Sequence, residues 1–356
     1  MWLNFKHRYS PVLVRLANSI LALWLVTILF FAMTEFAVWD FAIASATQFT
    51  TQEDILALKQ ELGLFLAPTV RYLQWLANAL QGDLGTSWWL RHPVTDLIFH
   101  RLGNSLWLVL WAVVIAVPVA LLLSLATASW QKPWLDRFLA VTTLGMLAVP
   151  EFLLACILMF VGGIYLDWVP VITWFEPDMS ILERLHASAL PIISLQFVVV
   201  VPIYRLSRAA LNEVLKSDYI QMAELKGLPR GRILWRHALP NVVAPVSNIV
   251  VLTIANLFFG LVVIETMFAY PGLGYLLVKA AQLRDIPLIQ GCALLSGLLI
   301  ICLNFLADLL SVVLNPRLSQ PAKPTLLTLP GWFSKGRGGM HAFKLTTPVA
   351  VMALLA

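Results

Sequence analysis

The chain has 356 residues, of which 60% are hydrophobic and only 12% are charged, and its formal net charge is +5. Its mean hydropathy is +0.83 and its apolar residues fall in long runs, which excludes an ordinary soluble domain and indicates a polytopic membrane protein. The basic excess follows membrane topology, so it does not indicate nucleic-acid binding. The three cysteines lie inside apolar runs without a CxxC spacing, so we expect neither a metal site nor a disulfide framework; they are Cys156, Cys292 and Cys302.

The N-terminal part divides into a membrane helix and a more polar region. Residues 1–33 are a short basic segment and an apolar run long enough to cross a bilayer core of roughly 30 Å. The run has no small-residue cleavage site, so we expect the first transmembrane helix and not a signal peptide. Residues 34–103 form a long extracytoplasmic region. Within it, residues 53–62 are helix-like, Thr69–Gln81 is amphipathic and predicts a helix on the membrane surface, and Gly82–Ser87 is a turn cluster.

Five further apolar runs bring the number of predicted transmembrane helices to six. These runs cover residues 104–128, 138–165, 187–204, 242–264 and 287–314. Three prolines lie inside them or near their ends, and membrane helices tolerate proline where neighbouring helices satisfy the freed carbonyl groups; they are Pro118, Pro150 and Pro202. We therefore predict an all-α polytopic membrane protein with a transmembrane core at residues 104–318. The tail, residues 319–356, is rich in proline and glycine and has no clear fold.

The distribution of lysine and arginine predicts the orientation. If the N-terminus is cytoplasmic, the cytoplasmic segments hold 17 of the 24 basic residues, as the positive-inside rule requires. This orientation places residues 34–103 and 167–183 outside the cell. The polar stretch at residues 216–240 and the tail then lie in the cytoplasm, and we expect a multi-pass protein of the inner (plasma) membrane.

The stretch at residues 216–240 is a basic, polar insert between two apolar runs. Asp218 is predicted to cap a helix that starts at Tyr219, with Gln221 as the partner in a capping box. Gly227 fits the left-handed position that ends such a helix.

A second short helix is predicted after this glycine. Pro229 suits its first turn, and the helix should end before Pro240, because Leu239 precedes a proline. We call residues 217–240 the coupling element and expect this pair of helices to dock a partner protein.

The spacing of Ala223, Gly227 and Leu239-Pro240 resembles the "EAA" loop in permease subunits of ATP-binding-cassette importers. Gln221 and Met222 depart from that pattern, as does His237. Further segments resemble the dipeptide/oligopeptide/nickel branch of this family, and they are Asp218-Tyr219, Lys226-Gly227-Leu228, Arg236 to Asn241, Glu265 to Phe268 and Pro271 to Gly274. The similarity runs from about Arg71 to Arg317.

The resemblance implies two sets of site residues. The residues expected to dock an ATPase are Asp218, Tyr219, Ala223, Glu224, Gly227, Leu228, His237, Leu239 and Pro240. The residues expected to brace an outer loop are Glu265, Pro271, Gly272 and Gly274.

The resemblance also implies the partners. These are a second homologous permease, two ATP-binding-cassette ATPase subunits, an extracytoplasmic solute-binding protein and membrane lipid. Peptides or a related small solute would cross between the two permeases. The chain lacks a GxxxxGK[ST] phosphate loop, so we expect no ATPase site, no catalytic residue and no cofactor in it.

Two alternatives remain open on the residues alone. An ion-coupled secondary transporter would place an acid near the middle of the membrane, and Glu151 beside Pro150 is such an acid. A carboxylate that merely faces the interior of the bundle is an equally good interpretation of Glu151. A membrane scaffold that binds partners without transporting anything would also use the coupling element.

Overall fold

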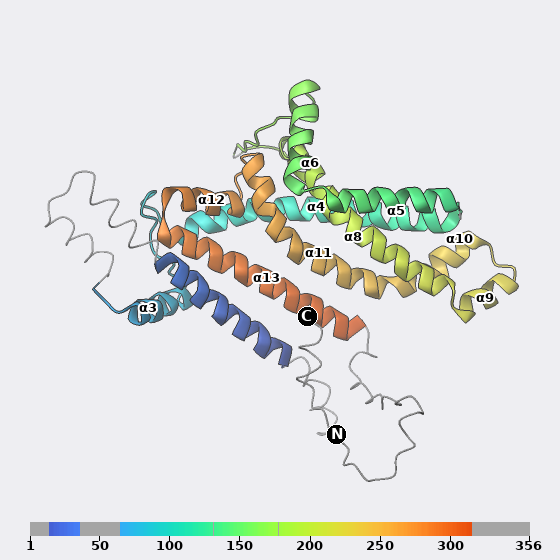
Figure 1. The fold of residues 1–356 in the computed structure, drawn as a ribbon, viewed down its shortest axis with the longest axis horizontal. Helices are drawn as coiled ribbons and strands as arrows, with labels where there is room; N and C mark the ends of the chain where they lie inside the picture. The colour runs from blue at the N-terminus through green and yellow to red at the C-terminus, as the bar shows by residue number, and fades with distance from the viewer. Residues whose placement is uncertain (1–13, 36–64, 131, 177, 315–356) are drawn as a thin grey trace, which may run out of the picture. The chain divides into compact units, whose positions relative to one another are not determined.

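The computed structural model describes residues 14–35, 65–130, 132–176 and 178–314, which are drawn as coloured ribbon in Figure 1. The regular secondary structure in these parts is helical, apart from one isolated bridge between Thr86 and Pro93. The first helix is Val14–Glu35. It is followed by α3 (Pro68–Leu80), α4 (Val94–Trp130), α5 (Pro133–Ala148), α6 (Glu151–Leu158), the π-helical η1 (Met159–Tyr165), α7 (Ile181–Ala187), α8 (Ala189–Leu215), α9 (Asp218–Leu225), α10 (Arg230–Arg232), the π-helical η2 (Ile233–Ala238), α11 (Leu239–Met267), α12 (Leu273–Leu283) and α13 (Ile286–Leu314). The helix predicted at residues 53–62 and the tail at 319–356 lie outside the described residues.

Within the described residues, five helices are long and apolar enough to cross a membrane. They are Val14–Glu35, α4, α8, Pro245–Met267 of α11 and Ile286–Leu309 of α13. A sixth crossing would be formed by α5 together with α6 and η1. The prediction of an all-α polytopic membrane protein is therefore confirmed.

The run at residues 138–165 was predicted as one span, but the structure breaks it. The helices Pro133–Ala148 and Glu151–Tyr165 meet at an angle of 99°, and Figure 1 shows α6 standing across the direction of α5. Val149 has an extended backbone, with φ −85° and ψ 124°, because the ring of Pro150 disfavours a helical conformation in the residue before it.

Two other spans are longer than their apolar runs. Helix α4 begins at Val94, ten residues before the predicted boundary at 104, and α8 continues to Leu215 although its apolar run ends near 204. Pro202 lies inside α8 without ending it. Apolarity therefore marks the part of each helix suited to lipid, whereas the helices continue into polar sequence at one end.

The core of the bundle lies where α4, α8 and α11 pack together. Small residues on α4 recur every four positions, and Ala112, Ala116 and Ala120 are fully buried there. Residues four apart share one face of a helix, so this stripe lets the backbone of a neighbouring helix approach closely. At the end of the stripe, the Ser124 hydroxyl donates to the Tyr204 carbonyl of α8 at 3.3 Å.

The helix Val14–Glu35 packs on α3, and the two lie side by side in Figure 1. The Thr27 and Tyr72 hydroxyls are 2.9 Å apart, and Phe31 meets the Tyr72 ring edge-on. The apolar face predicted for this helix consists of Leu73, Leu76, Ala77 and Leu80. Leu73 and Leu80 are 62% and 82% exposed, whereas Leu76 is half-buried. Placement of α3 on a membrane surface stays a prediction.

Candidate functional site

The first helix of the coupling element, α9, begins one residue earlier than predicted. Its N-cap is Ser217 and not Asp218, and neither forms a capping box. The Ser217 hydroxyl donates to the Val214 carbonyl of α8, and the Gln221 amide donates to the Lys216 carbonyl at 3.3 Å. The prediction was wrong because α8 runs on to Leu215, which makes Ser217 the single extended residue between two helices.

The end of α9 has the conformation predicted for Gly227. This glycine has a φ of +73°, in the left-handed region. The Gly227 N–H donates to the Glu224 carbonyl at 2.9 Å, and the Leu228 N–H donates to the Ala223 carbonyl at 3.2 Å. These two bonds form a complete Schellman motif, which closes the helix and turns the chain back.

The second helix of the element does not end before Pro240, contrary to prediction. From Arg230 the chain is helical through α10 and η2 and continues directly into α11. Leu239 keeps helical angles of φ −56° and ψ −46° although a proline follows it. Pro240 has no N–H group, so it needs no carbonyl acceptor in the preceding turn. The wider π-helical turns of η2 come just before it, and the helix continues through the proline.

The two helices of the element share a small apolar core of their own. Ile220, Ala223 and Ile233 are buried against one another, and Leu228 and Leu215 pack around them. Ala223 is only 7% exposed, so it holds α9 against η2 and presents almost no surface to a partner.

The remaining residues implied by the resemblance differ in exposure. Asp218, Tyr219, Glu224, Gly227 and Pro240 are exposed, whereas Leu228, His237 and Leu239 are half-buried. Three large apolar residues of the element to which the resemblance assigned no docking role are also exposed: Met222 at 54%, Leu225 at 82% and Trp235 at 59%. Large apolar residues in an otherwise polar insert were the sequence signal that could have identified this exposed surface.

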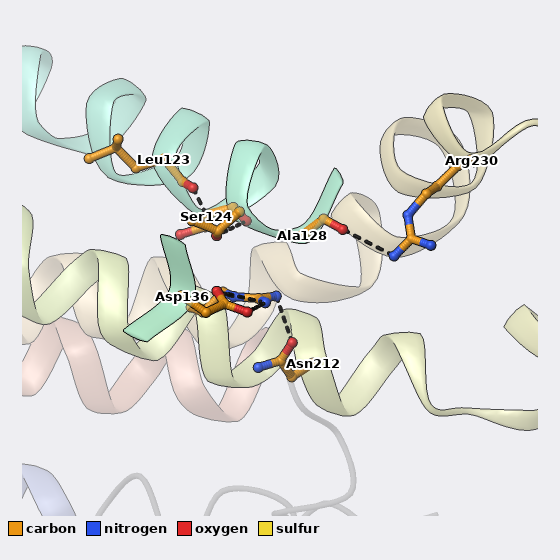
Figure 2. A network of polar contacts seen from close by, with 8 residues as sticks. Leu123, Ser124, Ala128, Asp136, Asn212 and Arg230 are labelled. Carbon is orange, nitrogen blue, oxygen red and sulfur yellow. Dashed lines mark hydrogen bonds and ion pairs between the residues drawn. The ribbon is translucent and has the colours of Figure 1, made fainter. Parts of the chain in front are cut away.

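Polar contacts join the element to the bundle. The Arg230 guanidinium donates to the carbonyl of Ala128, near the end of α4, at 3.1 Å, as Figure 2 shows. The Asn241 amide of α11 donates to the Tyr219 hydroxyl of α9 at 3.0 Å. Next to this region, Asp136 of α5 accepts two bonds from the Arg208 Nη2 of α8, at 3.0 and 2.8 Å. The first two contacts therefore hold the element against α4 and α11.

A second cluster of site residues surrounds Glu265, near the opposite end of α11. Glu265 is fully buried, and its Oε1 accepts a bond from the Ser105 hydroxyl at 2.6 Å. Its Oε2 accepts bonds from the backbone N–H groups of Gly274 at 2.7 Å and Tyr275 at 3.0 Å. The carboxylate thus satisfies the free N–H groups of the first turn of α12.

The loop between α11 and α12 fits closely around this carboxylate. A Cβ on Gly272 would collide with the Glu265 carboxyl group, and one on Gly274 would lie 2.7 Å from the Cα of Val262. The Pro271 carbonyl accepts a bond from the Asn104 amide at 2.8 Å. The four residues that the resemblance assigned to loop bracing therefore lie together in space.

The comparison with known proteins shows the family of the chain. Residues 116–320 match the model of a family described as binding-protein-dependent transport system inner membrane component. The chain belongs to this family. The matched residues include the coupling element and the segment from Glu265 to Gly274, but not Asn104 and Ser105. The family description and the several membrane-crossing helices make this permease a multi-pass protein of the inner membrane.

Curated relatives of the permease are similar over nearly their whole length. The oligopeptide transport system permease protein AppB of Bacillus subtilis is 32% identical over 310 residues, which is 86% of this chain and 98% of the relative. The glutathione transport system permease protein GsiC of Pectobacterium atrosepticum is 32% identical over 305 residues, or 85% and 96%. GsiC of Escherichia coli is 31% identical over 305 residues, or 86% and 97%.

Several residues around Glu265 were not found from the sequence. The Tyr270 hydroxyl donates to the Asn104 carbonyl at 2.7 Å, and burial raises the pKa of this hydroxyl, so it stays protonated. The Arg184 guanidinium donates to the Asn104 side-chain oxygen at 2.7 Å and lies over the rings of Trp107 and Phe175, at 4.6 and 4.7 Å. No spacing rule links these residues, which come from α4, α7 and two loops.

Asp285 is another residue that the sequence did not indicate. It is 1% exposed and accepts bonds from the Ser87 hydroxyl, from the N–H groups of Trp88 and Trp89 at 3.3 and 3.2 Å, and from the Leu288 N–H at 3.3 Å. One carboxylate therefore fixes the segment after the Gly82–Ser87 turn to the junction of α12 and α13.

Glu151 is the first residue of α6 and is half-buried against α11 of the permease. A Cβ on Gly260 would collide with its carboxyl group, so the glycine makes room for the acid. In the described parts of the chain, no group of three or more His, Cys, Asp or Glu side chains is arranged to hold a metal ion.

Proposed function

We propose that this permease and a second, homologous permease form the path by which small peptides or related solutes enter the cell. The names of the relatives support the substrate class, because AppB is named for oligopeptides and GsiC for glutathione, which is itself a short peptide. The family description supports a solute-binding protein as a partner. Two ATP-binding-cassette ATPases supply the energy, since the sequence contains no phosphate-binding loop.

The observation that carries the proposal is the surface of the coupling element. Met222, Leu225 and Trp235 are exposed on a short helical pair whose own core is closed. Exposed apolar side chains rimmed by polar ones mark a protein contact surface. Docking of an ATPase buries this surface, with Asp218, Tyr219, Glu224 and Pro240 at its polar rim.

The helical connection from the element to α11 accounts for coupling. The chain is helical without a break from Arg230 to Met267, so a displacement of η2 moves α11 as well. Near its far end α11 carries Glu265, which holds the start of α12. ATP-driven closure of the two ATPases is thereby transmitted to the loop that Glu265, Pro271, Gly272 and Gly274 brace.

The proposed orientation places the coupling element in the cytoplasm. It rests on the excess of basic residues, 17 of 24, in the segments that are cytoplasmic if the N-terminus is inside. The Glu265 cluster then lies on the outer side, where the solute-binding protein docks.

The test is retention of the ATPases by a variant of the docking surface. The permease is co-expressed with its second permease and tagged ATPases, and the assembly is captured from membranes. Leu225→Glu places a charge in the proposed contact, so we expect loss of the ATPases and of peptide uptake. The matched control for ATPase retention is Leu182→Glu, because Leu182 is 78% exposed and lies on α7, away from the element. Full retention and uptake by Leu225→Glu contradicts the proposal.

The same assembly distinguishes the two alternatives. A secondary transporter takes up solute in vesicles that contain this chain and an ion gradient but no ATPase, and Glu151→Gln abolishes that uptake. A scaffold captures the ATPases but never supports uptake. The proposal requires that uptake depends on ATP, on both permeases and on the binding protein.

A further inference from the structure

Two polar side chains at membrane depth belong to neither the coupling element nor the Glu265 cluster. Glu151 is the first residue of α6, and Asn256 lies near the middle of the span Pro245–Met267 of α11. Asn256 is exposed and Glu151 is only half-buried, so a molecule outside the chain can reach both side chains.

Gly260 brings the two side chains to one face of α11. A Cβ on Gly260 would collide with the Glu151 carboxyl group, so this carboxyl group rests directly on the glycine. Asn256 precedes Gly260 by four positions, and residues four apart share one face of a helix. The carboxyl group and the position of Asn256 are therefore separated by about one helical turn, or roughly 5.4 Å along α11.

Neither polar group is satisfied within the described parts of the chain. The Glu151 carboxylate and the Asn256 amide have no hydrogen bond or ion pair there. Helix α6, η1 and the span Pro245–Met267 contain no lysine, arginine or histidine, so they offer the acid no cation. The position of Glu151 in the first turn of α6 favours its negative charge, because the N-terminal end of a helix is electropositive.

The depth of these groups limits what lies beside them. Hydrocarbon offers no hydrogen bonds, so an unpaired carboxylate and amide near the middle of a span face water, a solute or another subunit. The helix that carries Asn256 and Gly260 is also the one that continues from the coupling element. In the proposed function, this face of α11 therefore moves when the ATPases close.

We propose that Glu151 binds the N-terminal ammonium group of a peptide in the path, and that Asn256 bonds to the peptide backbone beside it. The inference rests on the function proposed above and adds the residues that orient the solute. Every unblocked peptide carries this ammonium group whatever its sequence, and a carboxylate without a cation of its own is its complement. A carboxamide both donates and accepts, which suits the N–H and C=O groups of a peptide unit.

The first test measures uptake together with ATP hydrolysis. Both permeases, the two ATPases and the solute-binding protein are reconstituted in vesicles with a radiolabelled tripeptide. Glu151→Gln keeps the size of the side chain but removes its charge. We expect uptake to fall about tenfold or more while ATP hydrolysis continues, as for one lost hydrogen bond to a charged group. Glu151→Asp keeps the charge and should restore part of the uptake.

The matched control for the loss of charge is Asp308→Asn. Asp308 lies in the span Ile286–Leu309 of α13, but it already pairs with Arg15 at 3.2 Å. We therefore expect uptake per ATP hydrolysed to stay unchanged. If the Glu151→Gln assembly loses its second permease, Glu151 is an interface residue and the proposal is wrong.

Photolabelling tests the orientation of the peptide. Two tripeptides of alanine carry one photoreactive leucine, either as the N-terminal or as the C-terminal residue. With transport arrested during ATP hydrolysis, we expect the N-terminal probe to label α6 and the turn around Asn256 several-fold more than the C-terminal probe. Equal labelling by the two probes, or no label in these segments, overturns the proposal.

Failure of this inference and failure of the proposed function give different results. An assembly that takes up tripeptides at the same rate after Glu151→Gln refutes the inference alone. An assembly that takes up no tripeptide, with or without ATP, refutes the proposed function, and the inference falls with it.

Discussion

Glu265 and Gly272 are in such close contact that a methyl group on the glycine would occupy the place of the carboxyl group. Gly272 precedes α12 and has an ordinary φ of −102°, so the requirement for glycine here is steric and not conformational. The contact allows a fully buried acid to reach the N–H groups of Gly274 and Tyr275.

Gly272→Ala is therefore expected to destabilise the permease. Added volume at a well-packed site costs about 1–3 kcal/mol, and here it also displaces the acceptor of three hydrogen bonds. The measurement is the unfolding midpoint of the purified chain in detergent. Gly103→Ala is the control, because a Cβ at Gly103 meets no atom within 4 Å inside α4, and we expect it to be neutral or stabilising. Equal midpoints for both variants contradict the close-contact argument.

Substitutions of Glu265 itself should fall in a definite order. Glu265→Leu leaves the N–H groups of Gly274 and Tyr275 and the Ser105 hydroxyl without their acceptor, and each buried orphan costs about 1–3 kcal/mol. Glu265→Gln keeps one oxygen for the two N–H groups, so its loss should be smaller. Thermal unfolding of the two variants side by side checks the order. A leucine variant as stable as the glutamine variant would show that the carboxylate contributes no net stabilisation.

Gly227→Val is expected to strain the end of α9. At a φ of +73°, a β-branched residue costs about 1 kcal/mol or more, and relief of this strain changes the angle between α9 and α10. We predict a protein that inserts normally but does not hold its ATPases, measured as membrane abundance together with ATPase capture. Gly231→Ala is the control, since Gly231 has no positive φ and no atom near its Cβ position. Full ATPase capture and transport at normal abundance would refute the element as the coupling site.

The proposed topology makes a prediction that needs no partner. A reporter fused after Glu224 should lie in the cytoplasm, and a reporter fused after Asp178 should lie outside. The reason is the asymmetric distribution of basic residues between the two sides. Enzymatic reporters that are active on one side only provide the measurement. An outside signal at Glu224 would overturn both the orientation and the docking proposal.

Local rules predicted the parts of this fold that depend on neighbouring residues. The left-handed Gly227 is an example, because a glycine that follows an amphipathic helical segment commonly takes the left-handed position that ends the helix. The same rules failed at Pro240, where the π-helical turns of η2 carry the helix through a proline. They failed again at Ser217, because the end of α8 depends on packing and not on apolarity.

Residues joined only by the tertiary structure were beyond such rules. Asp285 bonds to Ser87, which lies 198 positions earlier, and Tyr270 bonds to Asn104, which lies 166 positions earlier. Glu265 was assigned to loop bracing by the family resemblance, whereas its partner Ser105, 160 positions earlier, was not found. The exposed Leu225 and Trp235 were also missed, since burial in a helical pair depends on how the two helices pack.

The 99° corner between α5 and α6 limits what surrounds this part of the permease. A bend of that size leaves backbone groups at Val149 and Pro150 outside a regular helix, and hydrocarbon offers them no hydrogen bonds. Irregular backbone at membrane depth is tolerated only against protein or water. If α5 and α6 form one span, we therefore expect the corner to adjoin a neighbouring subunit or a hydrated passage and not the acyl chains.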